Sequence, residues 1–542
     1  MSPELNNKIN EILTEMKRVY LHDHRPWIIG YSGGKDSTTV VQLAYSMLQT
    51  LTPNERIKPI YVISSDTLIE NPIVLAFLHE NSQIIGKVAD EQKLPLFTEI
   101  IRPQYNNSFW ANVIGKGMPT PTSIRFRWCT ERLKIQPSNQ FIEQKVTENG
   151  EVVVLLGVRK AESAIRKTRI ENRAIEGYLL TPHTTLNNTY VYNPIVELST
   201  DDVWAYLLNN NGNTPWGISN NELFKLYLGA DSGECPFTIT ADASGRIASP
   251  SCGNSRFGCW ICTVVAEDKS LTGFIDNGEE SLLPLLNFRA WILSIRDKHE
   301  YRQKHRRDGH HYYKKIYLKS LHLLENNSLN DDYIFVDEYG HQYIDTKNSH
   351  KDYETGKTRI STDKDKIALD LLPLQNDCID SNKISSDDQG EYINILGYGP
   401  FNFKGRQMIL RKLLEMQKDY WDQGFDFELI TREELYEIQK YWDQEEDLTR
   451  RTLVDLYYEI MGERLPWDTY KKPLYDDDTL TEIKLLGEKL NLRSDLVNKL
   501  LIQTNQVKYY SNKSKLDNAI TKLLKQSHWH QVITEEIEHD NQ

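Results

Sequence analysis

Cysteine is scarce in this 542-residue sequence, long apolar runs are missing, and basic residues are outnumbered by acidic ones. Six cysteines are too few for a disulfide scaffold in a chain of this length, which excludes the small disulfide-stapled folds. No run of about 18 apolar residues occurs, so we expect no transmembrane helix and no membrane partner. The first residues, MSPELNNKINEIL, lack a basic stretch followed by an apolar one, so we expect no secretory signal and a cytoplasmic location.

The charge balance limits how the chain can meet a polyanion. It has 64 Lys and Arg against 77 Asp and Glu, a formal net charge of −13. Proteins that bind nucleic acid unaided are usually basic, because Lys and Arg make the phosphate contacts. A polyanionic substrate would therefore have to meet a local basic patch or be presented by a partner. With 39% hydrophobic and 26% charged residues, the chain can form packed cores.

Four short apolar runs, at 27–32, 59–66, 94–101 and 152–158, alternate with segments of helical periodicity. Strands that alternate with helices at this spacing predict βαβ units and a parallel sheet covered on both faces. We therefore predict an α/β fold, a doubly wound parallel sheet, over residues 1–228.

Two further regions are expected after this sheet. Residues 229–275 are rich in Gly, Ser, Pro and Cys, and so long a stretch inside a compact domain needs something to hold it. We interpret it as a cysteine-rich cluster insertion. Residues 276–542 are predicted to form a mainly helical extension, with a polar irregular insertion at about 324–395.

The most informative motif is a hexapeptide between the first predicted strand and its following helix: Ser32, Gly33, Gly34, Lys35, Asp36 and Ser37. Glycines let the backbone approach a phosphate closely, and a helix N-terminus offers free N–H groups to an anion. Lys35 adds a charge for phosphate, and Asp36 is suited to hold Mg²⁺ or to cap the helix. Asp36 stands where a Walker A loop has Ser or Thr, which excludes that motif. An ordinary Gly-Gly turn with a helix cap is the alternative.

The hexapeptide SGGKDS resembles the PP-loop of ATP pyrophosphatases, which cleave ATP between the α- and β-phosphates. This resemblance implies ATP as cofactor and an adenine nucleotide alpha hydrolase-like fold. Three further stretches resemble the sulfonucleotide reductase (PAPS reductase-like) branch: SDT at 65–67, GVRKAES at 157–163 and the PIVE and DDVWAYL segments within 194–207.

The resemblance also implies roles for single residues. Nucleotide contacts would come from Asp66, Gly157 and Arg159, and Lys35, Asp36, Arg159 and Arg166 would be catalytic. Both arginines follow the end of a predicted strand, on the rim where open parallel sheets bind ligands. A solvated basic loop is the alternative for this segment.

One cysteine lies in a basic segment, RFRWCTERLK, at 125–134. A thiol surrounded by Arg and Lys is expected to have a lowered pKa, which would make Cys129 a better nucleophile or metal ligand. The pattern RxxCTxxLK resembles the corresponding segment of sulfonucleotide reductases, and we include Cys129 among the candidate catalytic residues. A persulfide carrier, a cluster ligand, a substrate-side thiol and a buried small side chain are all compatible with the pattern.

Four cysteines fall within 28 positions of one another: Cys235, Cys252, Cys259 and Cys262. Four thiolates suit either zinc or an iron–sulfur cluster. Zinc commonly uses two close CxxC pairs, whereas only one is present here, and the neighbouring aromatic residues suit a shielded cluster. We favour a 4Fe–4S cluster, with zinc as the alternative and a disulfide as the weakest interpretation.

A basic stretch at 296–319 carries nine Lys and Arg against three Asp and Glu, with tyrosines interleaved. Such a segment in an acidic protein is a candidate nucleic-acid patch, and a solvated helix face is the alternative.

Taken together, the PP-loop, the cysteines and the long extension resemble the DndC family, the sulfurtransferase-like ATP pyrophosphatases of bacterial DNA phosphorothioation (Dnd) systems. The resemblance implies ATP-dependent incorporation of sulfur into the DNA backbone. It also implies a cysteine desulfurase as sulfur source, and DNA and other Dnd proteins as partners. The alternatives are a sulfonucleotide reductase, a tRNA-thiolating enzyme, or a non-catalytic nucleotide-binding subunit of a DNA modification complex.

Overall fold

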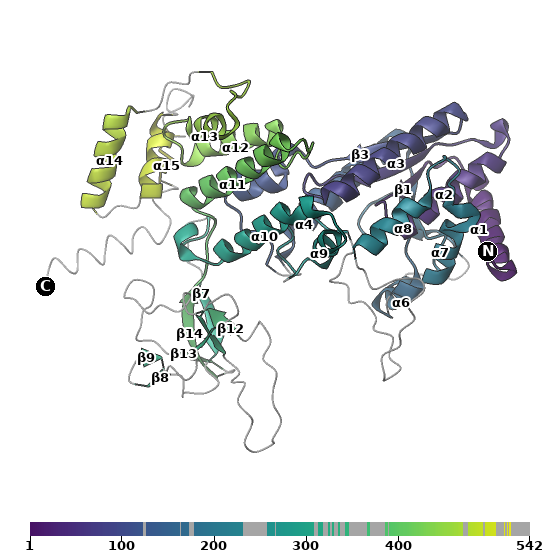
Figure 1. The fold of residues 1–542 in the computed structure, drawn as a ribbon, viewed down its shortest axis with the longest axis horizontal. Helices are drawn as coiled ribbons and strands as arrows, with labels where there is room; N and C mark the ends of the chain where they lie inside the picture. The colour runs from purple at the N-terminus through teal and green to yellow at the C-terminus, as the bar shows by residue number, and fades with distance from the viewer. Residues whose placement is uncertain are drawn as a thin grey trace, which may run out of the picture. The chain divides into compact units, whose positions relative to one another are not determined.

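The computed structural model (Figure 1) divides into two compact units. The first unit comprises 1–111, 121–290 and 419–434, and the second comprises 112–120, 291–418 and 435–542. The structure describes residues 1–122, 126–162, 164–172, 178–230, 257–265, 267–307, 313–317, 324–325, 328–329, 334–336, 342–345, 366–368, 385–387, 390–469, 475–490, 494–505, 514, 517–518 and 520–521. The predicted domain limits at 228 and 275 remain predictions, because residues 231–256 lie outside these ranges.

The first unit is built on a six-stranded sheet in the order β3-β2-β1-β4-β6-β5. All strands are parallel except the edge strand β5, which is antiparallel to β6. The strands are β1 (Trp27–Gly30), β2 (Ile60–Ser65), β3 (Leu96–Ile101), β4 (Val152–Leu155), β5 (Thr181–Pro182) and β6 (Thr189–Tyr192). The predicted α/β fold with a mainly parallel sheet is confirmed, and each of the four apolar runs contains a strand.

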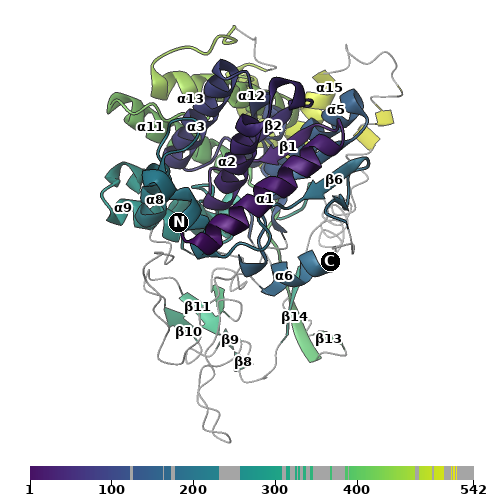
Figure 2. The ribbon, with the colours of Figure 1, turned by 90° about the vertical axis from the view of Figure 1, so that its right-hand side faces the viewer.

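Helices cover both faces of this sheet, as the alternating side chains of its strands require. On one face Trp27 and Ile29 pack in a core with residues of α1 (Pro3–His22), α2 (Lys35–Thr50), α3 (Pro72–Glu91), α7 (Thr200–Leu207) and α8 (Asn220–Gly229). On the other face Ile28 and Val154 pack with Ile142 of α5 (Gln136–Asn149). Figure 2 shows α1 and α2 on the same side of β1 and β2.

The strand order creates a switch point in the middle of the sheet. From β1 the chain proceeds outward to β2 and β3, and it then returns to place β4 on the other side of β1. In open α/β sheets, ligands bind outside the carboxyl ends of the strands at such a point. The loops that follow β1 and β4 are therefore expected to form the site, and they contain the SGGKDS and GVRKAES motifs.

The C-terminal region is mainly helical among the described residues, as predicted. Its helices are α11 (Phe403–Asp422), α12 (Arg432–Glu445), α13 (Thr452–Met461), α14 (Asp477–Lys489) and α15 (Ser494–Asn505). Shorter helices occur earlier in the chain: α4 (Trp128–Thr130), α6 (Ala164–Glu171), α9 (Lys269–Asp276) and α10 (Leu283–Arg296). Within the described ranges, no helix combines the length and the apolar character needed to cross a membrane.

Short strands occur in the stretch expected to be irregular and just before it, among the described residues. They pair antiparallel in three small sheets, two of three strands and one of two. The strands are β7 (Tyr313–Tyr317), β8 (Leu324–Glu325), β9 (Ser328–Leu329), β10 (Ile334–Val336), β11 (Gln342–Asp345), β12 (Lys366–Ala368), β13 (Ser385–Asp387) and β14 (Gly390–Leu396). Polar composition concealed the alternation in segments such as YINIL at 392–396.

A buried glutamate of the first unit, Glu434, lies in the first turn of α12. The Thr431 N–H donates to the Glu434 carboxylate (3.0 Å), and the Glu434 N–H donates to the Thr431 hydroxyl (3.1 Å). This reciprocal pair satisfies two backbone donors at the helix start. Burial raises the pKa of Glu434 to about 7, and bonds to Ser108 and Thr431 only partly oppose this rise. The carboxyl group is therefore accommodated more easily in its protonated form.

This carboxyl group predicts a pH-dependent stability. Because its pKa is higher in the folded state than in the unfolded chain, its contribution is complete below about pH 4.5 and is lost as the pH rises through 7. We therefore compare the unfolding free energies of Glu434→Gln and wild type by urea unfolding at pH 5 and at pH 8. The difference in favour of the variant is expected to be about 3 kcal/mol larger at pH 8 than at pH 5. Glu433→Gln changes an exposed neighbour and should show no such gain. An equal difference from wild type at both pH values in Glu434→Gln would contradict the prediction.

Candidate functional site

The PP-loop turns tightly between β1 and α2. Gly33 has a φ of +70°, a backbone conformation that favours glycine. The Ser32 N–H donates to the Ser37 hydroxyl (3.2 Å), which in turn donates to the Gly34 carbonyl (3.0 Å). Gly34 is the N-cap of α2 and supplies no side-chain cap. Hydrogen bonds of the Ser37 hydroxyl thus hold the loop together, and no side chain of the N-cap residue binds the first N–H groups of α2.

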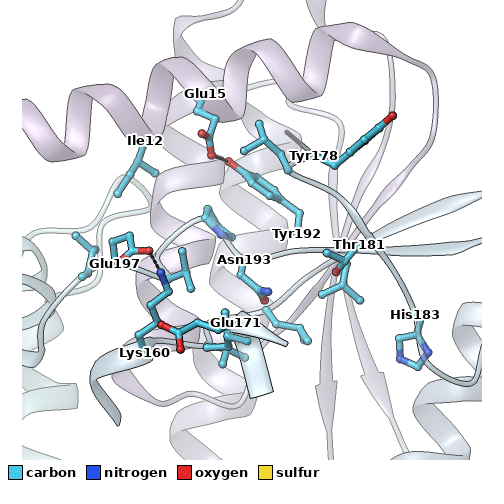
Figure 3. Close-up of a pocket in the computed structure, with 18 of the residues that line it drawn as sticks. Ile12, Glu15, Lys160, Glu171, Tyr178, Thr181, His183, Tyr192, Asn193 and Glu197 are labelled. Carbon is cyan, nitrogen blue, oxygen red and sulfur yellow. Dashed lines mark hydrogen bonds and ion pairs between the residues drawn. The ribbon is translucent and has the colours of Figure 1, made fainter. Parts of the chain in front are cut away.

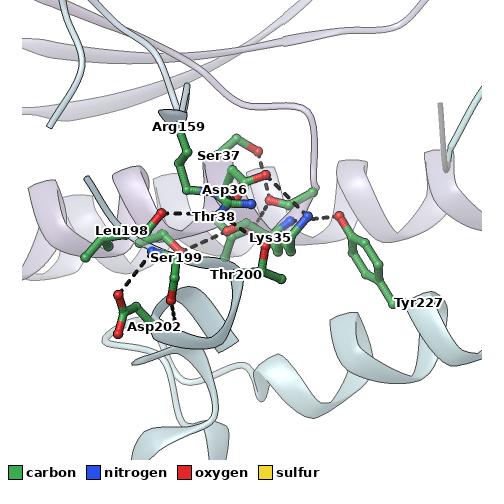
Figure 4. A network of polar contacts seen from close by, with 12 residues as sticks. Lys35, Asp36, Ser37, Thr38, Arg159, Leu198, Ser199, Thr200, Asp202 and Tyr227 are labelled. Atoms are coloured by element: carbon green, nitrogen blue, oxygen red, sulfur yellow. Dashed lines mark hydrogen bonds and ion pairs between the residues drawn. The ribbon is translucent and has the colours of Figure 1, made fainter. Parts of the chain in front are cut away.

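A buried ion pair holds the loop to the segment after β4 (Figure 4). The Arg159 Nε donates to the Asp36 carboxylate at 2.7 Å. The same guanidinium donates to the Leu198 carbonyl (3.3 Å) and to the Thr200 hydroxyl (3.2 Å), and Arg159 is only 1% exposed. In this arrangement Arg159 positions Asp36, and its predicted catalytic and nucleotide-binding roles stay predictions.

Gly157 lies directly against the PP-loop. A Cβ atom at this position would lie 2.8 Å from the carbonyl carbon and oxygen of Asp36 and 3.0 Å from the Ser37 nitrogen. Any side chain would therefore push the loop away from the segment after β4. Gly157 thus permits the close contact of the two loops, and a direct nucleotide contact is still a prediction.

Lys35 is placed at the start of α2 with little freedom. It is 5% exposed, and its ammonium lies 3.4 Å from the Asp36 carboxylate. Its backbone N–H donates to the hydroxyl of Tyr227 (3.1 Å), a residue of α8 that no sequence motif singled out.

Asp66, one of the predicted nucleotide contacts, follows β2 and is 2% exposed. Its carboxylate accepts from the Arg102 Nε (2.8 Å) and from the Leu68 N–H (2.9 Å), and the His79 ring lies 3.5 Å away. Protein donors therefore hold this carboxylate, and the nucleotide contact is an untested prediction. Arg102 is the first residue after β3, a position that could have marked it in the sequence.

Arg166 belongs to α6, which follows the loop after β4. Its side chain lies outside the described part of the structure, so its predicted catalytic role is untested.

Two of the four clustered cysteines pack on the segment that follows β2. Cys259 forms a β-bridge with Glu70, and the Trp260 N–H donates to the Ile69 carbonyl (3.1 Å). The Cys259 sulfur lies 3.7 Å from the Thr67 hydroxyl. The Arg289 Nε donates to the Cys262 carbonyl (2.7 Å). The CxxC pair is thereby fixed beside the carboxyl end of β2, whereas Cys235 and Cys252 lie outside the described residues.

Cys129 belongs to the same neighbourhood. Burial raises its pKa, with the nearby Cys262 as the next cause, and these two causes outweigh Arg127. The prediction of a lowered pKa is therefore wrong, because the surrounding core removes the thiolate from water. Burial likewise raises the pKa of Cys259 to about 12, and Glu70 adds to the rise.

A partly exposed lysine, Lys134, lies among these groups. The Lys134 ammonium lies 2.9 Å from the Glu70 carboxylate. Burial lowers its pKa, but Glu70 and then Cys259 and Cys129 raise it above the usual value. Lys134 therefore remains charged next to the cysteines.

The chemistry of these thiols fits a metal ion or cluster. Cys129, Cys259 and Cys262 influence one another electrostatically, and a bound cation would reverse the penalty on each thiolate. The rings of Trp110, Trp260 and Phe288 pack with centroids 5.7–6.1 Å apart near the CxxC pair. As placed, no three His, Cys, Asp or Glu side chains of the described ranges form a metal-binding group. Zinc and a 4Fe–4S cluster therefore remain alternatives.

A cavity of about 820 Å³ lies between α1, the loop after β4 and strand β6 (Figure 3). Four glutamates and two lysines line it: Glu11, Glu15, Glu171, Glu197, Lys8 and Lys160. Lys160 is paired with Glu197, and Glu15 accepts from the Tyr192 hydroxyl (2.7 Å). This excess of acidic groups disfavours a phosphate, so the cavity is a poor candidate for the ATP phosphates or a DNA backbone.

The basic stretch at 296–319 is a smaller patch than its sequence suggested. Arg302 is 5% exposed, and its guanidinium donates to the Gly399 carbonyl (2.7 Å from Nε), so it belongs to the core of the second unit. Arg307 is exposed but pairs with Glu445. The expectation that Arg302 contributes to a nucleic-acid surface is therefore wrong.

Comparison with known proteins gives a family match for the N-terminal part of the chain. Residues 26–265 match the family model of the phosphoadenosine phosphosulfate reductase domain. This part of the chain is therefore similar to the PAPS reductase-like domain of the PP-loop superfamily. An uncharacterized protein of Methanocaldococcus jannaschii is 29% identical over 198 residues, which are 36% of this chain and 33% of that protein. The match thus spans about a third of the length of this relative.

Solved structures with similar portions come from several enzymes. A phosphoadenylyl-sulfate reductase from Candida auris is 16% identical, with a TM-score of 0.25 over 42% of this chain and 92% of that one. An FMN adenylyltransferase from Candida glabrata is 14% identical, with a TM-score of 0.26 over 42% and 64%. A tRNA thiolase from Methanococcus maripaludis, solved with its 4Fe–4S cluster, is 13% identical, with a TM-score of 0.27 over 54% and 79%.

Proposed function

We propose that this protein is an ATP pyrophosphatase and sulfurtransferase that incorporates sulfur into the DNA backbone. The observation that carries the proposal is the position of the CxxC pair. Cys259 packs on the segment after β2, while the PP-loop follows the adjacent parallel strand β1. A nucleotide-activating loop and a group of thiols thus lie at the carboxyl ends of two neighbouring strands.

The activation step uses the PP-loop. The backbone N–H groups at the start of α2 and the Lys35 ammonium would bind the phosphates of ATP with Mg²⁺. Arg159 would keep Asp36 oriented in the loop. A non-bridging oxygen of the DNA phosphate attacks the α-phosphorus, the bond to the β-phosphate bridge breaks, and pyrophosphate leaves.

The transfer step replaces the activated oxygen. The outer sulfur of a persulfide, supplied by a cysteine desulfurase, attacks the DNA phosphorus, and AMP leaves with the former phosphate oxygen. An external thiol then cleaves the S–S bond, which leaves the sulfur on phosphorus and joins the thiol to the carrier cysteine as a disulfide. AMP is a much better leaving group than an oxide, which is the chemical reason for adenylation. Cys129, Cys259 and Cys262 would hold a 4Fe–4S cluster, which would supply an iron site for the incoming sulfur. Other Dnd proteins would present the DNA, because a chain of net charge −13 is expected to bind duplex DNA weakly.

Sulfonucleotide reduction is the second candidate, and the family match over 26–265 favours it. It would use the same loop to bind a small sulfonucleotide and would release sulfite. Three measurements separate DNA phosphorothioation, tRNA thiolation and sulfonucleotide reduction: sulfur in DNA, sulfur in tRNA and the release of sulfite.

We expect Lys35→Met to lower pyrophosphate release from ATP at least about 100-fold, because it removes a charge next to the transferred group while keeping the side-chain volume. Pyrophosphate is measured directly, and urea unfolding checks that the variant is folded. The same variant should fail to restore phosphorothioate to the DNA of cells that lack the gene, as read by mass spectrometry of digested DNA. Release of ADP and orthophosphate by the wild type would refute the assignment as an ATP pyrophosphatase. Loss of a tRNA thiolation instead of DNA sulfur in the deleted strain would refute the DNA assignment.

A further inference from the structure

Tyr227 lies between the PP-loop and the cysteine segment. Its hydroxyl accepts the N–H of Lys35 at 3.1 Å, and a Cβ atom on Gly34 would lie 3.2 Å from the same oxygen. The Lys35 ammonium lies 5.4 Å from the centre of its ring. The tyrosine thus binds one of the backbone groups that a phosphate would use in a PP-loop.

The ring of Tyr227 is held on two sides. It packs edge-on against Trp204 of α7, with centroids 5.1 Å apart, and against Phe257, at 4.8 Å. Tyr227 is 7% exposed, so the ring has little space in which to move without shifting a neighbour.

Phe257 leads directly to the thiols. It stands two residues before Cys259, and the Trp260 N–H that follows is bonded to the Ile69 carbonyl. A displacement of Phe257 would therefore reach the CxxC pair through a single intervening residue, Gly258.

We propose that Tyr227 is a positioning residue that couples occupancy of the PP-loop to the conformation of the cysteine segment. The inference rests on the proposed binding of ATP phosphates by the loop. A phosphate that accepts the Lys35 N–H displaces the Tyr227 hydroxyl, and the tightly packed ring transmits its shift to Phe257. By thermodynamic linkage, a ligand that fixes the cysteine segment changes the affinity for ATP by the same factor by which ATP changes the affinity for that ligand.

The test compares Tyr227→Phe with wild type in the full chain. The variant keeps the ring but removes the hydroxyl that ATP must displace, so ATP is expected to bind roughly two- to tenfold more tightly, the equilibrium factor of one hydrogen bond. Calorimetry with Mg²⁺ and ATP measures the affinity. Hydrogen exchange of residues 257–265, read by mass spectrometry, should change on ATP addition in wild type and not in the variant.

Tyr206→Phe is the matched control. Tyr206 is a buried tyrosine of α7 whose hydroxyl bonds to Ser46 and Gln42, away from the loop, so both ATP affinity and the exchange response should be kept. Wild-type affinity together with a wild-type exchange response in Tyr227→Phe would overturn the coupling while leaving ATP binding intact. Failure of the wild type to bind ATP would overturn the proposed function and the coupling with it.

Discussion

Asp36→Ala is expected to lower the free energy of unfolding of the first unit by about 3–5 kcal/mol. The reason is the partner left behind: Arg159 is 1% exposed, and its guanidinium would lose the carboxylate that lies 2.7 Å away. A buried charge without its counter-ion costs far more than the pair itself contributes. Urea unfolding followed by circular dichroism measures the loss.

A double-mutant cycle provides the control. Arg159→Met fills a similar volume without a charge, so adding it to Asp36→Ala should recover part of the lost stability rather than add to the loss. Single and double losses that add to within about 0.5 kcal/mol would contradict the direct coupling. Asp36→Asn keeps a hydrogen-bond acceptor for Arg159 and is therefore the better variant for a study of Mg²⁺ binding. A loss of activity in Asp36→Ala would not by itself identify a catalytic role, because the variant is also expected to be less stable.

The sheet could be predicted because its strands are continuous apolar runs. Buried parallel strands such as 152–155 are apolar on both faces, and their spacing reveals the βαβ order. Strand β6 escaped notice because TYVY at 189–192 is short and follows a polar segment, HTTLNN. The edge strand β5 has two residues, too few for any periodicity.

The candidate site was predictable only where it is local in sequence. Ser32 to Ser37 are contiguous, so strand, turn and helix start could be recognised together. Tyr227 reaches the loop from 192 positions away, and no pattern in α8 announces its hydroxyl. For Cys129, neighbours in the sequence were misleading. The basic residues around it suggested a low pKa for its thiol, whereas burial in the fold raises that pKa.

The structure sharpens the expectation for the cysteines. It places Cys129 in electrostatic contact with Cys259 and Cys262, although 130 and 133 positions separate them in the chain. The sequence-based ligand set of Cys235, Cys252, Cys259 and Cys262 is untested, because the first two lie outside the described residues. If Cys129 binds the cluster together with Cys259 and Cys262, only one further ligand is needed from Cys235 and Cys252.

Anaerobically purified protein is therefore expected to be brown, with broad absorbance near about 400 nm and about four irons per chain. Cys259→Ser and Cys262→Ser should each remove the colour, because each eliminates a thiolate held beside the segment after β2. Cys129→Ser should do the same if the fold brings a third ligand from the segment at 125–134. Cys378, the sixth cysteine, stands more than 100 positions after the others in the sequence, and Cys378→Ser is the control. A Cys129→Ser protein that keeps its iron would restore the set of four clustered cysteines. Comparing Cys235→Ser with Cys252→Ser then identifies the remaining ligand, and a colourless protein with one zinc would refute the cluster altogether.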